Sequence, residues 1–411
     1  MKRNSELKKT LQARWRLSLL SLIAPVLAIA AAPAVAQELD DEAMGKLDEL
    51  ITTELQDTPD IAKAPTPDAR RMYVVDPAAF TVLSRIMPID GNNGAYLGTV
   101  DTGLLALPVP SPKDGKLFMA DTRFSVFSNG KRDDFIGVYD PVTLETPSKL
   151  IDIPDTRSGA MVHIGGASTS KDGKYLYSYQ YAPANAVVIV DLENEKHLST
   201  IEVPQCWYVY PAGERRFASH CRDGSFVLVK FDENGKEVSR TQTEPVHDPV
   251  KQPSFNNPAY DYQTEEIVLV SYWGDVVHLD FSQDEPKIGK SWSLVTEEQR
   301  KNGWAPGGWQ PASYHSGSGR LYVLMDRRAK WAHTTESRSV WIYDTKSGER
   351  VQTIDLAHEA VALAVDKADK PYVYALSSHG KNLDIYDAGS GARLFGVDQL
   401  GHEPRLLVRN P

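Results

Sequence analysis

The chain has 411 residues, enough for one large β domain or for two domains of ordinary size. Its 45 Lys and Arg residues against 55 Asp and Glu residues give a net charge of −10, which argues against nucleic acid as the main partner. Two cysteines are too few for a disulfide-rich scaffold, and the sequence has no CxxC pair.

Residues 1–36 are predicted to be a secretory signal peptide. Residues 1–16 are basic, residues 17–32 are apolar and uncharged, and residues 34–36 have the small-x-small form of a cleavage site. The alternative is an uncleaved membrane anchor, but the apolar run is short for a membrane span. We therefore expect an exported protein.

Residues 37–66 are predicted to form an acidic N-terminal arm. Leu47, Leu50, Ile51 and Leu55 follow helical spacing, which favours a short amphipathic helix, and the end of the segment is rich in proline. The arm could dock on its own domain, reach a partner subunit, or be a loosely held terminus.

Residues 67–411 contain seven copies of one pattern: an apolar strand, a polar turn that begins with Asp, and a second strand. The copies are Met72–Ile86, Phe135–Ile153, Val187–Val203, Phe226–Glu244, Val276–Leu294, Val340–Leu356 and Leu383–Leu400. The turn aspartates are Asp76, Asp140, Asp191, Asp232, Asp280, Asp344 and Asp387. Their spacing averages about 50 residues, a repeat length typical of propeller blades. Because most copies follow another turn and strand, the pattern predicts an all-β, seven-bladed β-propeller.

The last apolar strand, Glu403–Arg409, has no hairpin of its own. We expect it to pair with strands of the first blade and close the ring, because closure protects sheet edges that would otherwise be exposed.

Cys206 and Cys221 are 15 residues apart, and the residues between them read as two strands around a turn. An antiparallel pair could bring the sulfurs together, and the predicted export favours a disulfide. The alternative is a reactive thiol, for which Arg222 is the nearby positive charge.

The chemistry-bearing residues form no recognisable catalytic motif. The ten histidines are scattered and most of them are interpreted as surface or loop residues, and no GxSxG, P-loop or metal-binding pattern occurs. The segment 301–314 is unusual because it contains Trp304 and Trp309 among glycines and prolines. It suits a subunit interface or the mouth of the propeller, and the alternative is a packed connector between blades.

The segment Asn302–Gln310, NGWAPGGWQ, resembles the DGWxPGGWQ string of the methylamine dehydrogenase heavy subunit family. Further matching strings extend the resemblance over residues 64–411: Ala64–Phe80, Asp140–Leu144, His220–Ser225 and Asn257–Tyr260. Cys206 and Cys221 match the cysteine pair of the family.

The resemblance implies a heavy subunit in a periplasmic α2β2 heterotetramer. The light subunit of such an enzyme carries tryptophan tryptophylquinone, a small primary amine is oxidised to an aldehyde and ammonia, and electrons pass to a small blue-copper protein of the amicyanin type. No catalytic residue, cofactor or metal is implied for this chain. The family's DPAHF string reads DPAAF here, so the resemblance places Phe80 on the path of the substrate, with Ala79 as a changed neighbour.

Two classes of function follow from the sequence. The first is the heavy subunit of an amine dehydrogenase, with methylamine favoured over aromatic amines as substrate. The second is a stand-alone exported propeller that binds a ligand or partner. A neighbouring coding region for a small cysteine-rich subunit with two candidate tryptophans would distinguish them.

Overall fold

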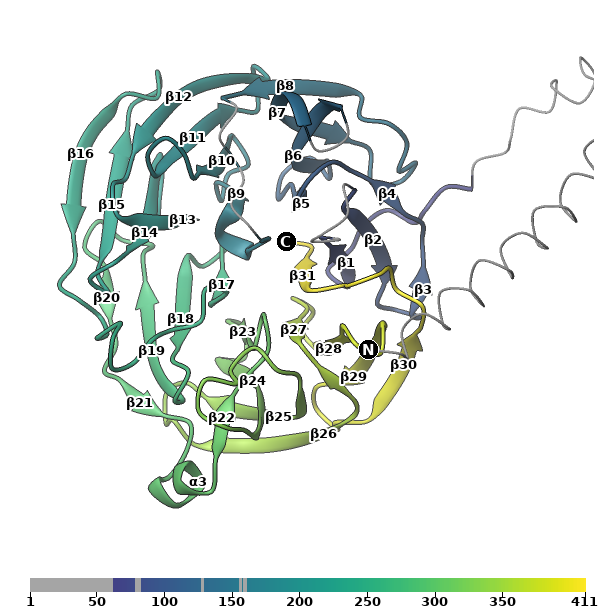
Figure 1. The fold of residues 1–411 in the computed structure, drawn as a ribbon, viewed down its shortest axis with the longest axis vertical. Coiled ribbons are helices and arrows are strands. Elements are labelled where there is room, and N and C mark those ends of the chain that lie inside the picture. The colour runs from purple at the N-terminus through teal and green to yellow at the C-terminus, as the bar shows by residue number, and fades with distance from the viewer. Residues whose placement is uncertain (1–61, 78–82, 127–128, 155–156, 158–160) are drawn as a thin grey trace, which may run out of the picture. The chain divides into compact units, whose positions relative to one another are not determined.

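The structure, a computed structural model, describes residues 62–77, 83–126, 129–154, 157 and 161–411. These residues form seven antiparallel sheets around a central axis, which confirms the predicted seven-bladed β-propeller (Figure 1). The predicted signal peptide and residues 37–61 of the predicted arm lie outside the described residues. The last residues of the arm pack on the propeller, where the Ala64 amide donates to the Val142 carbonyl at 2.8 Å.

The blades are numbered along the chain, and their strands are given from the axis outwards. Blade 1 contains β31 (Leu406–Arg409), β1 (Arg71–Asp76), β2 (Arg85–Asp90), β3 (Ala95–Tyr96) and β4 (Val100–Asp101). Blade 2 contains β5 (Leu107–Pro110), β6 (Leu117–Val126), β7 (Asn129–Tyr139) and β8 (Lys149–Ile153). Blade 3 contains β9 (Ala167–Thr169), β10 (Tyr175–Gln180), β11 (Ala186–Asp191) and β12 (Lys196–Glu202), preceded by the short 3₁₀ helix η1 (Ile164–Gly166).

The remaining four blades follow the same order. Blade 4 contains β13 (Cys206–Pro211), β14 (Arg216–Cys221), β15 (Phe226–Phe231) and β16 (Glu237–Gln242). Blade 5 contains β17 (Ala259–Asp261), β18 (Glu266–Val270), β19 (Asp275–Asp280), β20 (Lys287–Ile288) and β21 (Trp292–Ser293). Blade 6 follows the helix α3 (Glu297–Lys301) and contains β22 (Trp304–Pro306), β23 (Ala312–His315), β24 (Arg320–Arg327), β25 (Ser337–Asp344) and β26 (Arg350–Ala360). Blade 7 contains β27 (Ala362–Val365), β28 (Tyr372–Ser377), β29 (Asn382–Asp387) and β30 (Arg393–Val397).

The ring closes as predicted, within blade 1. Strand β31 pairs antiparallel with β1, with Tyr73 opposite Val408 and Val75 opposite Leu406. The innermost strand of this blade therefore comes from the end of the domain and the other strands from its beginning. Figure 1 shows the yellow β31 beside the purple β1 at the centre of the ring.

The seventh sequence copy, Met72–Ile86, is a hairpin, but it occupies a different part of its blade from the other six copies, contrary to the prediction. In the other six copies the hairpin joins the third strand to the outer strand, whereas β1 and β2 are the second and third strands. The equivalent turn aspartate is Asp90, not Asp76. Asp90 accepts a hydrogen bond from the Asn92 amide at 2.9 Å, as Asp140 does from Val142 at 2.8 Å. Asp76 is buried and accepts from the amides of His402 and Glu403 instead.

The hydrophobic core lies between neighbouring blades. Each cluster of buried side chains combines residues from adjacent sheets, such as Val74 of β1 with Leu376 of β28, and Tyr177 of β10 with Phe217 of β14. One blade alone cannot bury both of its faces, so the apolar strands are stabilised by stacking around the ring. In the part of the chain that the structure describes, no helix is long and apolar enough to cross a membrane.

Candidate functional site

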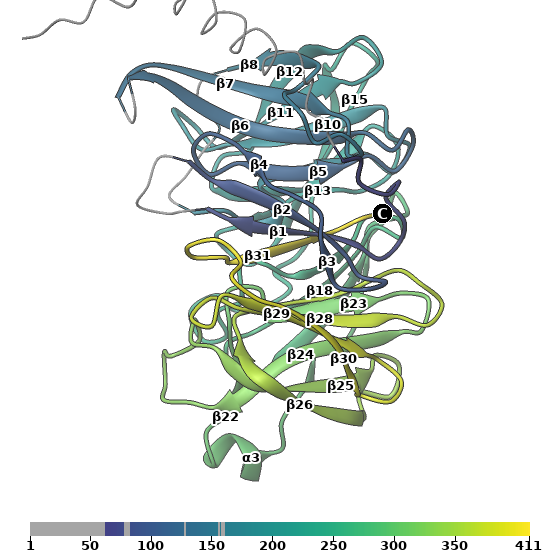
Figure 2. The same cartoon turned by 90° about the vertical axis from the view of Figure 1, so that its right-hand side faces the viewer.

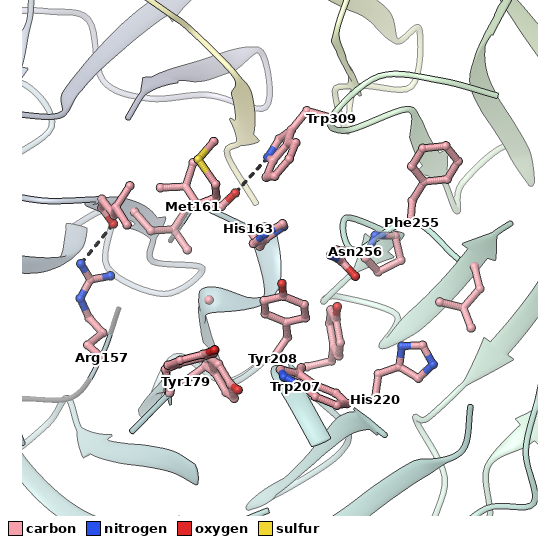
Figure 3. Close-up of a pocket in the computed structure, with 18 residues that line it drawn as sticks. Arg157, Met161, His163, Tyr179, Trp207, Tyr208, His220, Phe255, Asn256 and Trp309 are labelled. Atoms are coloured by element: carbon pink, nitrogen blue, oxygen red, sulfur yellow. Dashed lines mark hydrogen bonds between the residues drawn. The ribbon is translucent and has the colours of Figure 1, made fainter. Parts of the chain in front are cut away.

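A pocket of about 500 Å³ opens near the axis on one face of the ring (Figure 3). We call this the pocket face. Within each blade, this face carries the connection from the second to the third strand. It also carries segments that join one blade to the next: residues 102–106, 161–166, 203–205, 243–258, 294–303 and 398–405. In Figure 2 the β6–β7 hairpin projects from it at the left. The pocket is lined by Leu105, Leu107, Arg157, Met161, Val162, His163, Gly166, Tyr179, Tyr181, Trp207, Tyr208, Tyr210, His220, Phe255, Asn256, Pro258, Leu269 and Trp309.

Blade 4 supplies one wall through an irregular inner strand. The register between β13 and β14 shifts between Trp207 and Tyr210, and Tyr208 has a φ of 64°. Such a bulge re-aims side chains that regular alternation would send to opposite faces. Trp207, Tyr208 and Tyr210 therefore all reach the pocket.

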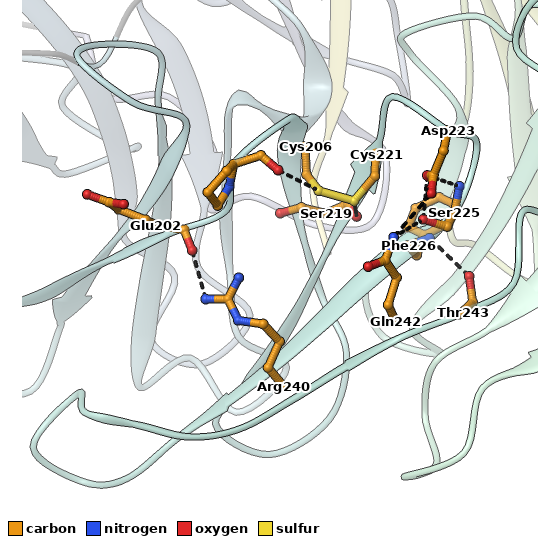
Figure 4. The surroundings of a disulfide bond; sticks show 11 residues. Glu202, Cys206, Ser219, Cys221, Asp223, Ser225, Phe226, Arg240, Gln242 and Thr243 are labelled. Atoms are coloured by element: carbon orange, nitrogen blue, oxygen red, sulfur yellow. Dashed lines mark hydrogen bonds between the residues drawn. A yellow bond between two sulfur atoms is a disulfide. The ribbon is translucent and has the colours of Figure 1, made fainter.

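The disulfide braces this wall. Cys206 and Cys221 are bonded and lie opposite each other in the β13–β14 pairing, directly before the pair Trp207–His220 (Figure 4). The predicted disulfide is confirmed, and the alternative of a reactive thiol is wrong. Its position fixes the ends of both strands at the point where they enter the pocket.

Trp309 forms another wall, in a break of the inner strand of blade 6 between β22 and β23. Its amide donates to the Val361 carbonyl at 2.6 Å and its indole N–H to the Val162 carbonyl at 3.0 Å. Asn257 donates to the Trp309 carbonyl at 2.8 Å. Gly308 precedes it with a φ of 128°, and a Cβ there would approach the Val361 carbonyl oxygen at 2.5 Å, so glycine is required. Trp309 thus ties together four blades at the pocket.

Two histidines line the pocket: His163 lies in the loop before η1, as interpreted for most of the histidines, and His220 lies on strand β14. Burial lowers the pKa of His163 to about 4, and burial, aided by His247, lowers the pKa of His220 to about 3. The two Nε2 atoms of His220 and His247 are 2.9 Å apart, and His247 Nδ1 contacts the Gln252 carbonyl at 3.0 Å. Both pocket histidines are therefore neutral near pH 7.

Trp304 lies away from this pocket, in a second cleft of about 490 Å³ on the pocket face. Its ring packs against Trp341 at 4.8 Å between centroids, and the Arg327 guanidinium lies 5.5 Å from its centre. The cleft is also lined by Trp273 and Trp331, whose rings are 5.1 Å apart. The two candidate interface tryptophans thus belong to separate hollows on one face, and their role at an interface stays a prediction.

Phe80 lies outside the described residues. The residues that flank it are anchored beside the pocket, because the Ser84 hydroxyl donates to the Pro77 carbonyl at 3.2 Å and lies 3.4 Å from the Ala106 amide. Ala106 follows Leu105, which lines the pocket. In the part of the chain that the structure describes, no group of three or more His, Cys, Asp or Glu side chains could hold a metal ion.

Comparison with known proteins decides the family. The family profile described as methylamine dehydrogenase heavy chain matches residues 68–410. The chain belongs to the methylamine dehydrogenase heavy chain family. It is similar to the methylamine dehydrogenase heavy chain of Paracoccus versutus, with 37% identity over 86% of this chain and 82% of the relative. The heavy chain of Methylophilus methylotrophus is 35% identical over 90% of both chains.

A solved structure of a functionally unknown protein from Desulfotomaculum acetoxidans shares the fold. Its TM-score is 0.55 with 12% identity, over 83% of this chain and 99% of that one. At this identity the likeness shows a common architecture alone. Membership of the methylamine dehydrogenase heavy chain family is what implies, in general terms, a light-subunit partner.

Proposed function

We propose that this chain is the heavy subunit of a periplasmic quinoprotein amine dehydrogenase that oxidises methylamine to formaldehyde and ammonia. In this proposal tryptophan tryptophylquinone belongs to the light subunit and supplies the redox chemistry. Two heavy and two light subunits form the assembly, and electrons pass to a small blue-copper protein of the amicyanin type. The match of residues 68–410 to the methylamine dehydrogenase heavy chain family carries the proposal.

The distribution of exposed apolar side chains supports docking of the light subunit on the pocket face. Among the described residues, eleven large hydrophobic side chains are exposed. Six of them lie on outer strands: Tyr96, Leu150, Val238, Ile288, Val351 and Leu394. The other five lie on the pocket face: Leu83, Val126, Tyr181, Val250 and Trp331. None of the eleven lies on the opposite face of the ring, so of the two faces the pocket face is the one with exposed apolar side chains that a partner could cover.

The role of this chain is then to position the light subunit and to shape the route of the substrate. Trp331 is 56% exposed and has a φ of 72°, an unfavourable conformation for a bulky side chain. Trp331 and Trp273 form an aromatic ridge at the second cleft, and buried tryptophans are the most frequent energetic anchors of interfaces. In this proposal Phe80 acts on the path of the substrate, as the match of DPAAF to the family's DPAHF string implies.

The test is to purify the mature chain with and without its light subunit. We expect the chain alone to show no quinone absorbance and no amine-dependent dye reduction, and the complex to show both. Dye reduction by methylamine with the chain alone would overturn the assignment of the chemistry to the partner. Failure to copurify with any small quinone-bearing subunit would favour the stand-alone binding module.

The docking face is tested by substitution. Trp331→Ala should weaken assembly by about 2 kcal/mol or more, roughly 30-fold in dissociation constant, because truncated hot-spot tryptophans have costs of this size. Leu394→Ala, on the outer strand β30, is the matched control and should assemble like the unmodified chain. Equal assembly of both variants would place the light subunit elsewhere.

A further inference from the structure

The pocket near the axis is walled mainly by aromatic rings. Tyr179 and Tyr208 lie 5.6 Å apart between ring centroids, Tyr208 and His163 4.9 Å, and His163 and Trp309 4.8 Å. This row of four rings runs along one side of the pocket. Figure 3 shows Phe255 approaching from another side, so the rings surround the space instead of filling it.

The rings are held in place by hydrogen bonds at their edges. The indole N–H of Trp309 donates to the Val162 carbonyl, and the Asn185 side chain donates to the Tyr179 hydroxyl at 2.6 Å. His163 and Tyr208 are fixed between these neighbours by ring contacts. The aromatic surface is therefore preorganised, which lowers the entropic cost of binding.

The wall of the pocket carries almost no free charge. Among the described residues that line it, none is Asp or Glu. The one strong cation, Arg157, directs its guanidinium to the carbonyls of Leu104 and Leu105 at 3.0 and 3.1 Å, and its backbone amide donates to Asp134. The pocket histidines are neutral near pH 7, as shown above. Burial also raises the pKa of Tyr179 to about 12, so its ring stays uncharged.

A neutral aromatic wall discriminates between ligands by charge. The faces of Trp and Tyr rings are the negative parts of their quadrupoles and attract cations within about 6 Å, while they repel anions. Protonated histidines would weaken this attraction, but both pocket histidines are neutral near pH 7. The volume of about 500 Å³ lies within the range of small-molecule sites and exceeds the size of methylammonium.

We propose that this pocket binds an organic ammonium ion that carries an apolar substituent, with the charged end against the rings of Tyr208 and Trp309. The substituent would pack along Leu105, Leu107 and Phe255, which supply the apolar part of the wall. This proposal concerns binding by the chain itself. It stands or fails without the assignment of amine oxidation to a light subunit.

The test compares a cation with its neutral isostere. Choline and 3,3-dimethylbutan-1-ol have the same shape and differ in charge, and calorimetric titration of the mature full chain at pH 7.5 measures both. We expect choline to bind roughly tenfold more tightly than the alcohol, from the strength of desolvated cation–π contacts. Benzylammonium should likewise bind more tightly than benzyl alcohol. Equal affinities within each pair, or no binding by either cation, would overturn the proposal.

Substitutions locate the site. Trp309→Leu should lower the affinity for choline roughly tenfold, whereas Leu394→Ala, on the outer strand β30, should leave it unchanged. Because Trp309 also packs against two hydrophobic clusters, Tyr208→Leu is a second test, with Tyr208→Phe as the control that keeps the ring. Circular dichroism verifies that each variant is folded. Folded Tyr208→Leu protein that binds choline like Tyr208→Phe would place the cation elsewhere and refute the assignment.

Discussion

Replacing Arg409 by Met should destabilise the propeller by about 3–5 kcal/mol, the usual cost of removing one partner from a buried charged network. Arg409 lies on β31 and is 8% exposed. Its guanidinium donates to the carbonyls of Tyr314 at 2.9 Å, Val365 at 3.1 Å and Tyr260 at 2.7 Å. These carbonyls belong to the inner strands of blades 6, 7 and 5. One side chain thus joins the closing strand to three further blades.

The magnitude follows from these three contacts. Hydrogen bonds to charged groups contribute about 1.5–3 kcal/mol each, and the burial of the guanidinium offsets a part of their sum. Methionine keeps most of the length of the side chain but donates no hydrogen bond. Three buried carbonyls then lose their hydrogen-bond donor. The net loss of unfolding free energy therefore falls near the middle of the range of about 3–5 kcal/mol.

Guanidinium chloride denaturation followed by tryptophan fluorescence measures the change, together with thermal melts. A domain of this size loses about 2 °C in Tm per kcal/mol, so Arg409→Met should melt roughly 6–10 °C lower. Arg405→Met is the matched control, because the Arg405 side chain pairs with the half-buried Glu403 beside it. It should cost less than about 1 kcal/mol. Equal melting of the two variants would refute the argument that Arg409 clamps the ring.

Three further outcomes are expected. Replacing Cys206 and Cys221 by Ala should cost about 3 kcal/mol on the loop-entropy estimate for 15 residues, and peptide mapping of the unreduced protein should show the linked pair, not two free thiols. In the assembled enzyme, Phe80→Ala should shift kcat/KM from methylamine towards longer alkylamines; an unchanged preference in a destabilised variant would instead indicate a packing role. Although burial opposes it, Arg409 and Lys367 lower the pKa of Asp261 to about 2. This carboxylate then contributes about 2–3 kcal/mol of stability above pH 4, and this contribution is lost as the pH falls through 2. Asp261→Asn should therefore reduce the fall in unfolding free energy between pH 4 and 2. An unchanged dependence of the unfolding free energy on pH would contradict this.

The fold could be predicted because its signals are local. A turn aspartate between two apolar strands is visible within about 17 residues, and the hairpin recurs in every blade. The prediction was wrong for Asp76 because the end of a second strand and the end of a third strand look alike in sequence: both are apolar runs followed by Asp. The cue that separates them is the Asx turn at Asp90, followed by Asn92 and Gly94.

The pocket could not be predicted in the same way. Its walls come from residues as distant in sequence as Leu105, His163, Tyr208 and Trp309, and no periodic pattern relates them. Trp309 stands out in the sequence among glycines and prolines, but its contact with His163 depends on the closure of the ring. The aromatic run after Cys206 was the available signal, and the bulge at Tyr208 that turns it into a wall depends on the pairing with β14.

The composite first blade has a consequence for synthesis of the chain. Strand β1 lies about 330 residues before its inner neighbour β31 in the sequence, so the two cannot pair until the whole domain has been made and is free to fold. Until they pair, one edge of β1 has no partner, and the contacts of Arg409 with blades 5, 6 and 7 do not exist. Unpaired strand edges promote association between chains. Strand β31, which is made last, therefore determines when blade 1 loses the exposed edge that promotes aggregation. A chain that is blocked at this C-terminal strand would leave an otherwise complete ring open.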